Sequence, residues 1–232
     1  MAVGLKSVFK NPSWLLRFKA LVYAAALFWV WLGAAEGELL PLFAFLFVAS
    51  FFYFSSLSRA ILLLPSFILI VVLSLVAARL TVAAVLAGFL FYVLIALKDY
   101  FFVNRQTWHF VLNFTVAAWA GVSAFIFPEY LPLLGLAYFL LLYEAVRSLS
   151  VTANFLFGFV GATILYQIAW ALSLLPIGFA SQAALAALFY YVGHELMTAY
   201  TAKQFLNVYA LRLATIALLV STAVFLVSDW AI

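Results

Sequence analysis

Two adjacent ionisable residues, His194 and Glu195, carry the clearest chemical signal in a chain that has only 2 histidines and 7 acidic residues. A zinc protease uses the pattern H-E-x-x-H, because histidines four residues apart on a helix bind one metal ion and the glutamate activates its water. In this sequence Thr198 occupies the position of the second histidine, and the other histidine, His109, lies on a different predicted helix. We therefore predict no metal site.

Other catalytic patterns are also missing. An intramembrane aspartyl protease needs two aspartates within the bilayer, whereas Asp99 and Asp229 fall on opposite sides of the membrane predicted below. The sequence has neither a G-x-S-x-G turn nor a Walker glycine loop. Because it has no cysteine, it forms no disulfide, thiolate metal site or cysteine nucleophile. We assign no catalytic residue and no cofactor.

The remaining ionisable residues gather at the cytoplasmic ends of the later predicted helices. Arg147 follows Glu144 by one turn, a spacing that allows an ion pair on one helix face. Arg212 lies inside an apolar segment, where a charge costs about 2.5–3.5 kcal/mol at the centre and less near the end, so we expect Glu144 or Glu195 as its internal partner. The predicted polar cluster consists of Glu144, Arg147, His194, Glu195, Arg212 and His109.

This cluster has two interpretations. We favour a charge pair that fixes helix packing; the alternative is a substrate or proton site open to the cytoplasm. Two uncharged residues, Asn113 and Gln167, lie deeper in their predicted spans. An amide in hydrocarbon needs a hydrogen-bond partner, so each either lines a path or joins two helices, and we favour the second.

The elements that hold these residues are membrane helices. Of the 232 residues, 70% are hydrophobic and 8% are charged, whereas a soluble domain has about 25% charged residues. A soluble fold of this size cannot hide so much apolar surface from water. The lipid bilayer is therefore a predicted partner. The net charge of +4 is small and scattered, so nucleic acid is not.

Nine segments are apolar enough to cross the hydrocarbon layer, which takes about 20 helical residues. The third and fourth are separated only by residues 78–81, so eight spans is the alternative, and Pro65 is expected to kink the third. The segments are approximately 14–34, 39–56, 60–78, 81–98, 107–127, 130–147, 154–175, 180–199 and 206–228.

The basic residues predict the orientation. Of the 11 Lys and Arg residues, all except Arg79 fall on one side of this threading, and the positive-inside rule makes that side cytoplasmic. The N-terminus is then inside and the C-terminus outside. Residues 1–13 are predicted to be an amphipathic cytoplasmic segment. A cleaved signal peptide is the less favoured interpretation of the first span.

We treat 1–232 as one transmembrane domain, with helix-hairpin repeats proposed around 88–127, 134–175 and 183–228. The repeat rests on the similarity of TWHFVLNFTVA, at 107–117, to TANFLFGFVGA, at 152–162. Chance matches among abundant Phe and Ala are the alternative, and we favour chance. Small residues in the second of these segments predict close packing of the seventh span.

Three function classes remain for this all-α, polytopic helix bundle of the plasma (inner) membrane. The first is a small permease or a transporter of lipid or another small molecule. The second is a non-catalytic membrane subunit or scaffold, with membrane-protein partners or further copies of itself. The third, an intramembrane enzyme at the cytoplasmic leaflet, is the least favoured. The first is supported by the deep amides and by the short loops, which leave no room for a soluble domain.

Overall fold

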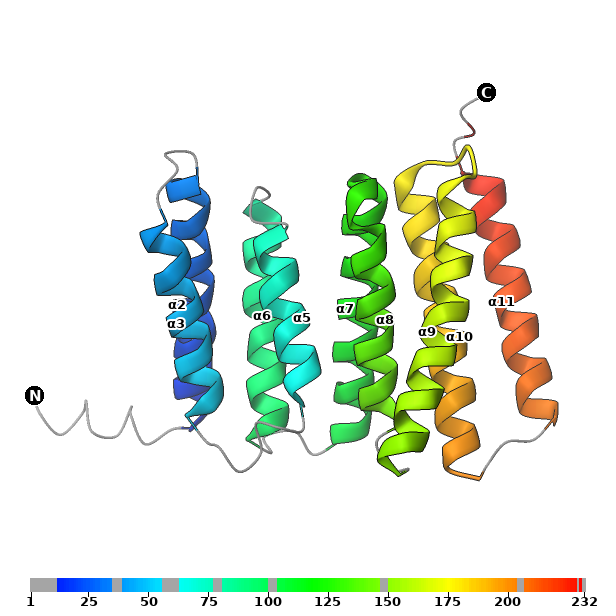
Figure 1. Cartoon of the computed structure of the whole chain (residues 1–232), viewed down its shortest axis with the longest axis horizontal. Coiled ribbons are helices and arrows are strands. Elements are labelled where there is room, and N and C mark those ends of the chain that lie inside the picture. The colour runs from blue at the N-terminus through cyan, green and yellow to red at the C-terminus, as the bar shows by residue number, and fades with distance from the viewer. Residues whose placement is uncertain are drawn as a thin grey trace, which may run out of the picture. The chain divides into compact units, whose positions relative to one another are not determined.

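The computed structural model describes residues 12–34, 39–55, 63–76, 81–99, 104–146, 150–203, 207–228 and 230, and nearly all of them are helical (Figure 1). The helices are α2 (Pro12–Ala34), α3 (Leu40–Phe54), α5 (Leu64–Val76), α6 (Thr81–Lys98), α7 (Arg105–Ile126), the short 3₁₀ helix η2 (Pro128–Tyr130), α8 (Leu131–Ala145), α9 (Val151–Ser173), α10 (Phe179–Thr201) and α11 (Asn207–Val227).

Each of the nine predicted segments overlaps one α-helix of the described part of the chain, with ends that differ by a few residues. The ends follow local sequence signals: the Ser150 hydroxyl caps α9 by accepting the Ala153 N–H at 3.3 Å, and Pro41 and Pro132 sit in first turns. The prediction of a kink at Pro65 is wrong. Pro65 is the second residue of α5, where a proline costs no helical hydrogen bond.

Four of the described helices are long and apolar enough to cross a membrane: α2 over Trp14–Gly33, α7, α9 and α11. Three shorter apolar helices are α3, α5 and the Ala84–Lys98 part of α6. The all-helical prediction is confirmed for the described residues, and the long apolar helices indicate a membrane protein.

The chain divides into two compact units, residues 1–112 and 113–232, with the boundary inside α7. In unit 1, α2 packs against α3 and α6, and α5 packs against α6. The ring of buried Tyr23 stacks on Phe91 with 4.0 Å between centroids, and its hydroxyl lies 3.0 Å from the Ser74 hydroxyl. At Gly88 a Cβ would lie 3.0 Å from Ala24 Cβ, so glycine allows α2 and α6 to approach closely.

Basic side chains meet the C-terminal ends of two helices in unit 1. Lys98 is only 1% exposed; its Nζ donates to the carbonyl of Tyr53, in the last turn of α3, and lies 5.1 Å from the Tyr53 ring centroid. Lys19 Nζ donates to Ser55 at 3.4 Å. Arg105 donates to the carbonyl of Leu97, at the end of α6, at 3.3 Å. The last carbonyls of a helix have no partner within it and carry partial negative charge, so these cations stabilise the helix ends.

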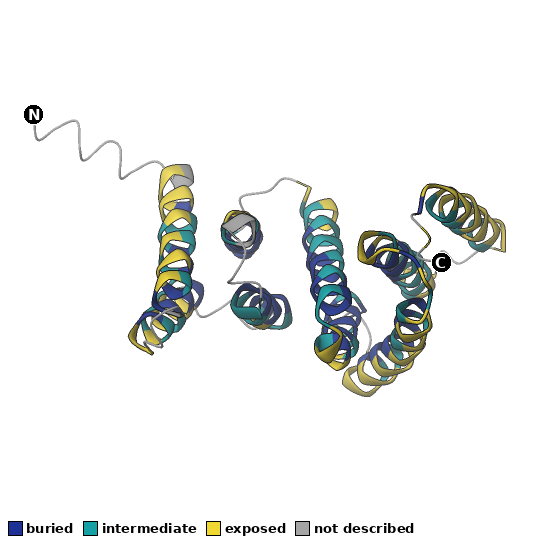
Figure 2. Cartoon of the chain, turned by 90° about the horizontal axis from the view of Figure 1, so that it is seen from above, coloured by how far each residue is buried: buried dark blue, intermediate teal, exposed yellow. Residues whose placement is uncertain are grey.

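In unit 2, α8 packs against α9, and α10 packs against α8, α9 and α11. The predicted close packing of the seventh span is present: Gly158 and Gly161 of α9 are buried, and a Cβ at Gly158 would lie 3.3 Å from the backbone of Tyr143 in α8. Leu213 is the one buried residue along α11. Viewed from above, α11 shows mostly exposed and intermediate residues, whereas α10 turns a buried side to its neighbours (Figure 2).

Candidate functional site

Helix α10 places the His194–Glu195 pair inside unit 2. It has 23 residues, as many as α9, but it is not among the four long apolar helices, because Gln182, His194 and Glu195 lower its hydropathy. The polar residues are accommodated because α10 contacts three other helices, so His194 and Gln182 turn toward protein. His194 is 6% exposed.

Four side chains form what we call the buried polar group: Tyr138 and Glu144 of α8, and Tyr190 and His194 of α10. Their exposed fractions are 1%, 5%, 0% and 6% in that order. The Tyr138 and Tyr190 rings are stacked, with 5.7 Å between centroids and 17° between planes. The Tyr190 and His194 ring centroids lie 6.0 Å apart. Glu144 is close enough to Tyr190 for its carboxylate to act electrostatically on the Tyr190 hydroxyl.

The two tyrosine hydroxyls of this group make no hydrogen bond within the part of the chain that the structure describes. A buried hydroxyl without a partner costs about 1–3 kcal/mol, and most buried polar groups therefore have a partner in the protein or in ordered water. Two such hydroxyls beside a carboxylate and an imidazole make this region suited to a small polar guest or water.

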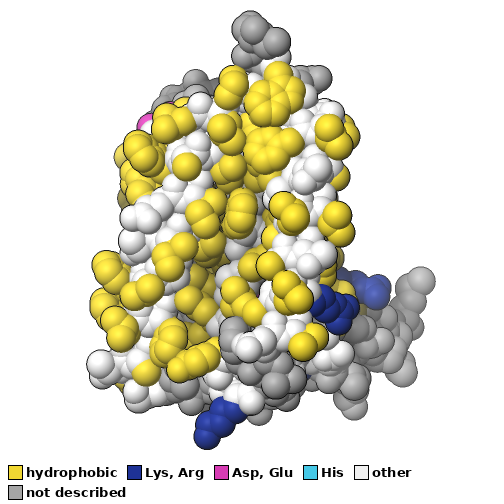
Figure 3. Space-filling view, turned by 90° about the vertical axis from the view of Figure 1, so that its right-hand side faces the viewer, with side chains coloured by type: hydrophobic (Ala, Val, Ile, Leu, Met, Phe, Trp, Pro, Cys, Tyr) yellow, Lys and Arg dark blue, Asp and Glu magenta, His cyan; other side chains and the backbone are white. Residues whose placement is uncertain are grey.

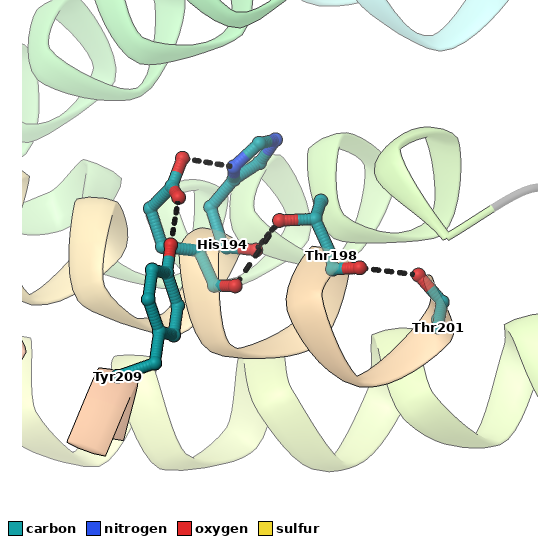
Figure 4. Close-up of polar contacts among 5 residues, drawn as sticks. His194, Thr198, Thr201 and Tyr209 are labelled. Atoms are coloured by element: carbon teal, nitrogen blue, oxygen red, sulfur yellow. Dashed lines mark hydrogen bonds and ion pairs between the residues drawn. The ribbon is translucent and has the colours of Figure 1, made fainter. Parts of the chain in front are cut away.

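A second set of contacts begins at the next residue of α10, Glu195, which is 27% exposed (Figure 4). Tyr209 of α11 donates its hydroxyl to Glu195 Oε2 at 2.5 Å. His194 Nδ1 lies 3.9 Å from Glu195 Oε1. Thr198 donates to the carbonyls of His194 and Glu195 at 3.0 and 3.1 Å. The Glu195–Tyr209 bond joins α10 to α11 next to the buried polar group.

The predicted polar cluster is only partly assembled in unit 2. Glu144, His194 and Glu195 come from α8 and α10 as expected. Arg212 is exposed on α11 and, among the described side chains, forms no ion pair with Glu144 or Glu195; its charge acts on Tyr209 instead. Arg147 lies outside the described residues.

The remaining predicted residues lie elsewhere. His109 belongs to the first turns of α7 in unit 1, where it lines a small cavity of about 220 Å³ with Arg105, Gln106 and Leu97 among its neighbours. Asn113 is fully buried on α7. Gln167 is exposed on α9, so it joins no two helices within unit 2.

Sequence reasoning missed the tyrosines and Lys98. Tyr190 precedes His194 by four residues, which places both on one face of a helix. The spacing alone could therefore have identified Tyr190 as a neighbour of His194. Tyr138 and Tyr209 come from other helices and needed the tertiary packing. Lys98 is not part of the predicted polar cluster, whereas the structure buries it against Tyr53.

An apolar groove of about 510 Å³ lies between α8 and α9. Aromatic rings form much of its wall: Phe155 contacts Phe139 edge-on, with 5.5 Å between centroids, and stacks on Phe159 at 6.2 Å. Tyr166 covers Gly135, where a Cβ would come within 3.1 Å of its ring. The lining residues are Pro132, Gly135, Leu136, Phe139, Phe155, Phe159, Ala162, Thr163 and Tyr166.

In chemical terms, the buried polar group combines a carboxylate, an imidazole and two phenols, groups that exchange protons or bind a small cationic or polar molecule. Within the described residues, no three His, Asp or Glu side chains converge in a way that would hold a metal ion.

Comparison with known proteins adds no relative: no family model, no curated protein and no solved structure matches this chain.

Proposed function

We propose that this chain is a nine-span permease of the plasma (inner) membrane, which moves a small polar or cationic solute in exchange with protons through the buried polar group. The observation that carries the proposal is the burial of Glu144 and His194 beside two tyrosine hydroxyls that have no partner among the described residues. Ionisable side chains inside a membrane bundle are costly, and they mark ion paths, proton relays and substrate sites.

The distribution of charge supports the threading. On the face of the chain shown in Figure 3, hydrophobic side chains cover most of the height, and the described Lys and Arg residues lie in its lower half. With the basic ends of the helices in the cytoplasm, the N-terminus is inside and the C-terminus outside. The weakest span is α5, whose 13 residues cover about 20 Å of the about 30 Å hydrocarbon layer.

The geometry supports entry from the cytoplasmic side. Glu195 is partly exposed and lies next to His194 near the C-terminal end of α10. Tyr190 precedes His194 by one turn, and its ring stacks on that of Tyr138. A cation is attracted to the carboxylates, and a proton released from Glu144 or His194 compensates the charge it brings. The stacked tyrosines then supply hydroxyls that replace water around the guest.

Proton flux tests this proposal. The purified chain is reconstituted into phospholipid vesicles that contain a pH-sensitive dye. Small inorganic and organic cations are supplied on the opposite side as candidate exchanging solutes, and a pH step is applied with the membrane potential clamped. We expect faster equilibration than in empty vesicles, and we expect Glu144→Gln to lose most of the excess. The matched control is Glu129→Gln, at an exposed glutamate of η2. Equal rates in wild-type and empty vesicles contradict the proposal.

A membrane subunit is the second candidate, and the exposure of α11 favours it. Only Leu213 of its 21 residues is buried, and large apolar side chains such as Val208, Leu218 and Leu226 are 68–80% exposed. A helix attached to one neighbour has room to contact another protein. Recovery of a different protein at fixed stoichiometry after extraction in mild detergent is the expected result for this candidate.

A further inference from the structure

Gln167 is an amide within a helix that is long and apolar enough to cross the membrane. It follows Val151, the first residue of α9, by 16 positions and precedes Ser173, the last, by 6. At about 1.5 Å per residue it lies about 24 Å from one end of the helix and about 9 Å from the other. Because the hydrocarbon layer is about 30 Å thick, this position is inside it.

The side chain of Gln167 points away from unit 2. It is exposed, and its neighbours one and two turns away on the same side of α9 are exposed and apolar: Val160 at 47%, Ile164 at 53% and Trp170 at 53%. Within the described part of the chain its amide makes no hydrogen bond. Hydrocarbon offers an amide no partner, so a group outside the described part of unit 2 is needed to satisfy it.

The chemistry of the amide selects a second copy of the chain. A glutamine carries both a donor and an acceptor, so it pairs with an identical glutamine, and in a two-fold interface the same residue can meet itself across the axis. Two small residues beside it, Thr163 and Ala171, allow close approach of two helices. The adjoining groove between α8 and α9 has room for side chains of the facing copy.

We propose that two copies of this chain associate through the exposed face of α9, with the two Gln167 amides hydrogen-bonded to each other across the two-fold axis. This interface is independent of the proposed transport, because Gln167 is not part of the buried polar group. The competing occupants are a lipid acyl chain in the α8–α9 groove, and unit 1 of the same chain or another protein against α9; none of these gives a covalent dimer in the crosslinking experiment below.

The absence of cysteine makes the proposal directly testable, because each introduced thiol is unique. Ala171→Cys places a thiol one turn from Gln167 and keeps the amide. The matched control is Ala223→Cys, an exposed alanine near the corresponding end of α11. After oxidation or short bifunctional crosslinking in vesicles, we expect Ala171→Cys to give a covalent dimer of this chain and Ala223→Cys to give far less.

The second part of the experiment removes the Gln167 amide. Added to Ala171→Cys, Gln167→Leu is expected to weaken dimerisation about threefold to twentyfold, the range for one interhelical hydrogen bond in a membrane. Thr163→Val is the control on the same face, because the Thr163 hydroxyl already donates to the Phe159 carbonyl at 2.8 Å; it should change nothing.

Two results overturn the proposal: a dimer yield from Ala171→Cys no greater than that from Ala223→Cys, or equal dimerisation with and without Gln167→Leu. The first result means that lipid, unit 1 of the same chain or another protein covers α9. The second means that apolar contact alone joins the copies. Unchanged folding of both cysteine variants, checked by their melting curves in detergent, is part of the experiment.

Discussion

Buried tyrosines differ between the two units of this chain. In unit 1 the Tyr23 hydroxyl is paired with Ser74, which also donates to the Ile70 carbonyl at 2.5 Å. In unit 2 the hydroxyls of Tyr138 and Tyr190 are equally buried and have no partner among the described residues. A paired hydroxyl stabilises helix packing, whereas an unpaired one is a cost that a guest or water removes. The contrast separates a structural interior from an interior suited to binding.

Charged residues show the same difference. Lys98, Lys19 and Arg105 each donate to an atom at or just after the C-terminal end of a helix in unit 1. Glu144 of unit 2 is buried near aromatic hydroxyls and an imidazole. The described cations of unit 1 therefore stabilise helix ends, whereas Glu144 of unit 2 lies near other polar side chains and is the charged group on which the proposed function depends.

The largest expected effect is at Lys98. Lys98→Met keeps most of the apolar stem but leaves the Tyr53 carbonyl at the end of α3 without its charged donor. Because hydrogen bonds to charged groups contribute about 1.5–3 kcal/mol, we expect a loss of that order in the free energy of unfolding. Thermal melting in detergent measures it, with Lys203→Met, at an exposed lysine, as the control. An unchanged melting temperature contradicts the structural role assigned to unit 1 cations.

Close helix packing should contribute equally to the stability of the two units. Gly88→Ala in unit 1 and Gly158→Ala in unit 2 both force a Cβ into a neighbouring helix, at 3.0 and 3.3 Å, and overpacking costs about 1–3 kcal/mol. Gly193→Ala places a Cβ in ordinary contact with Leu165, at 3.7 Å, and should stabilise the chain by about 0.5–1 kcal/mol because alanine favours a helix over glycine. Melting curves of the three variants measure these changes of stability in each unit. We expect equal losses from Gly88→Ala and Gly158→Ala, which would mean that the units differ in their buried polar groups and not in their helix packing.

The tyrosines provide the direct test of the comparison. Tyr23→Phe removes an interhelical hydrogen bond and should cost about 0.6 kcal/mol, the average for such bonds in membranes. Tyr190→Phe removes a hydroxyl that has no partner among the described residues, so the melting temperature of this variant should be equal to that of the wild type or higher, while proton flux falls. If Tyr190→Phe destabilises the chain as much as Tyr23→Phe does, the unit 2 hydroxyl is a structural group.

The smallest effect is expected at the edge of the buried polar group. Tyr209→Phe removes the bond to Glu195, but both residues are partly exposed, so the loss in stability should be about 0.5 kcal/mol. Crosslinking or exchange measurements at α11 should show looser attachment to α10. Leu219→Ala, on the exposed side of α11, is the matched control.

Much of the fold was predictable because membrane helices follow from local rules. A segment such as Val151–Ser173 is apolar, has about the length of the hydrocarbon layer, and begins at a serine that caps it. No tertiary contact is needed for those signals. The candidate site was predicted only in part: Glu144, His194 and Glu195 were identified because ionisable residues are rare in this chain, but Tyr138 and Tyr209 are ordinary aromatic residues until packing places them.

The sequence by itself indicated that lipid surrounds this protein, and it determined approximately where the helices begin and end. Hydropathy and helix caps act within one segment, so they need no tertiary contact. Only the tertiary structure decided which side of each helix is covered. It buried Lys98 against α3, left Arg212 and Gln167 exposed, and brought two tyrosines from α8 and α10 together. Burial depends on the rotation of each helix about its axis, which residues of other helices set.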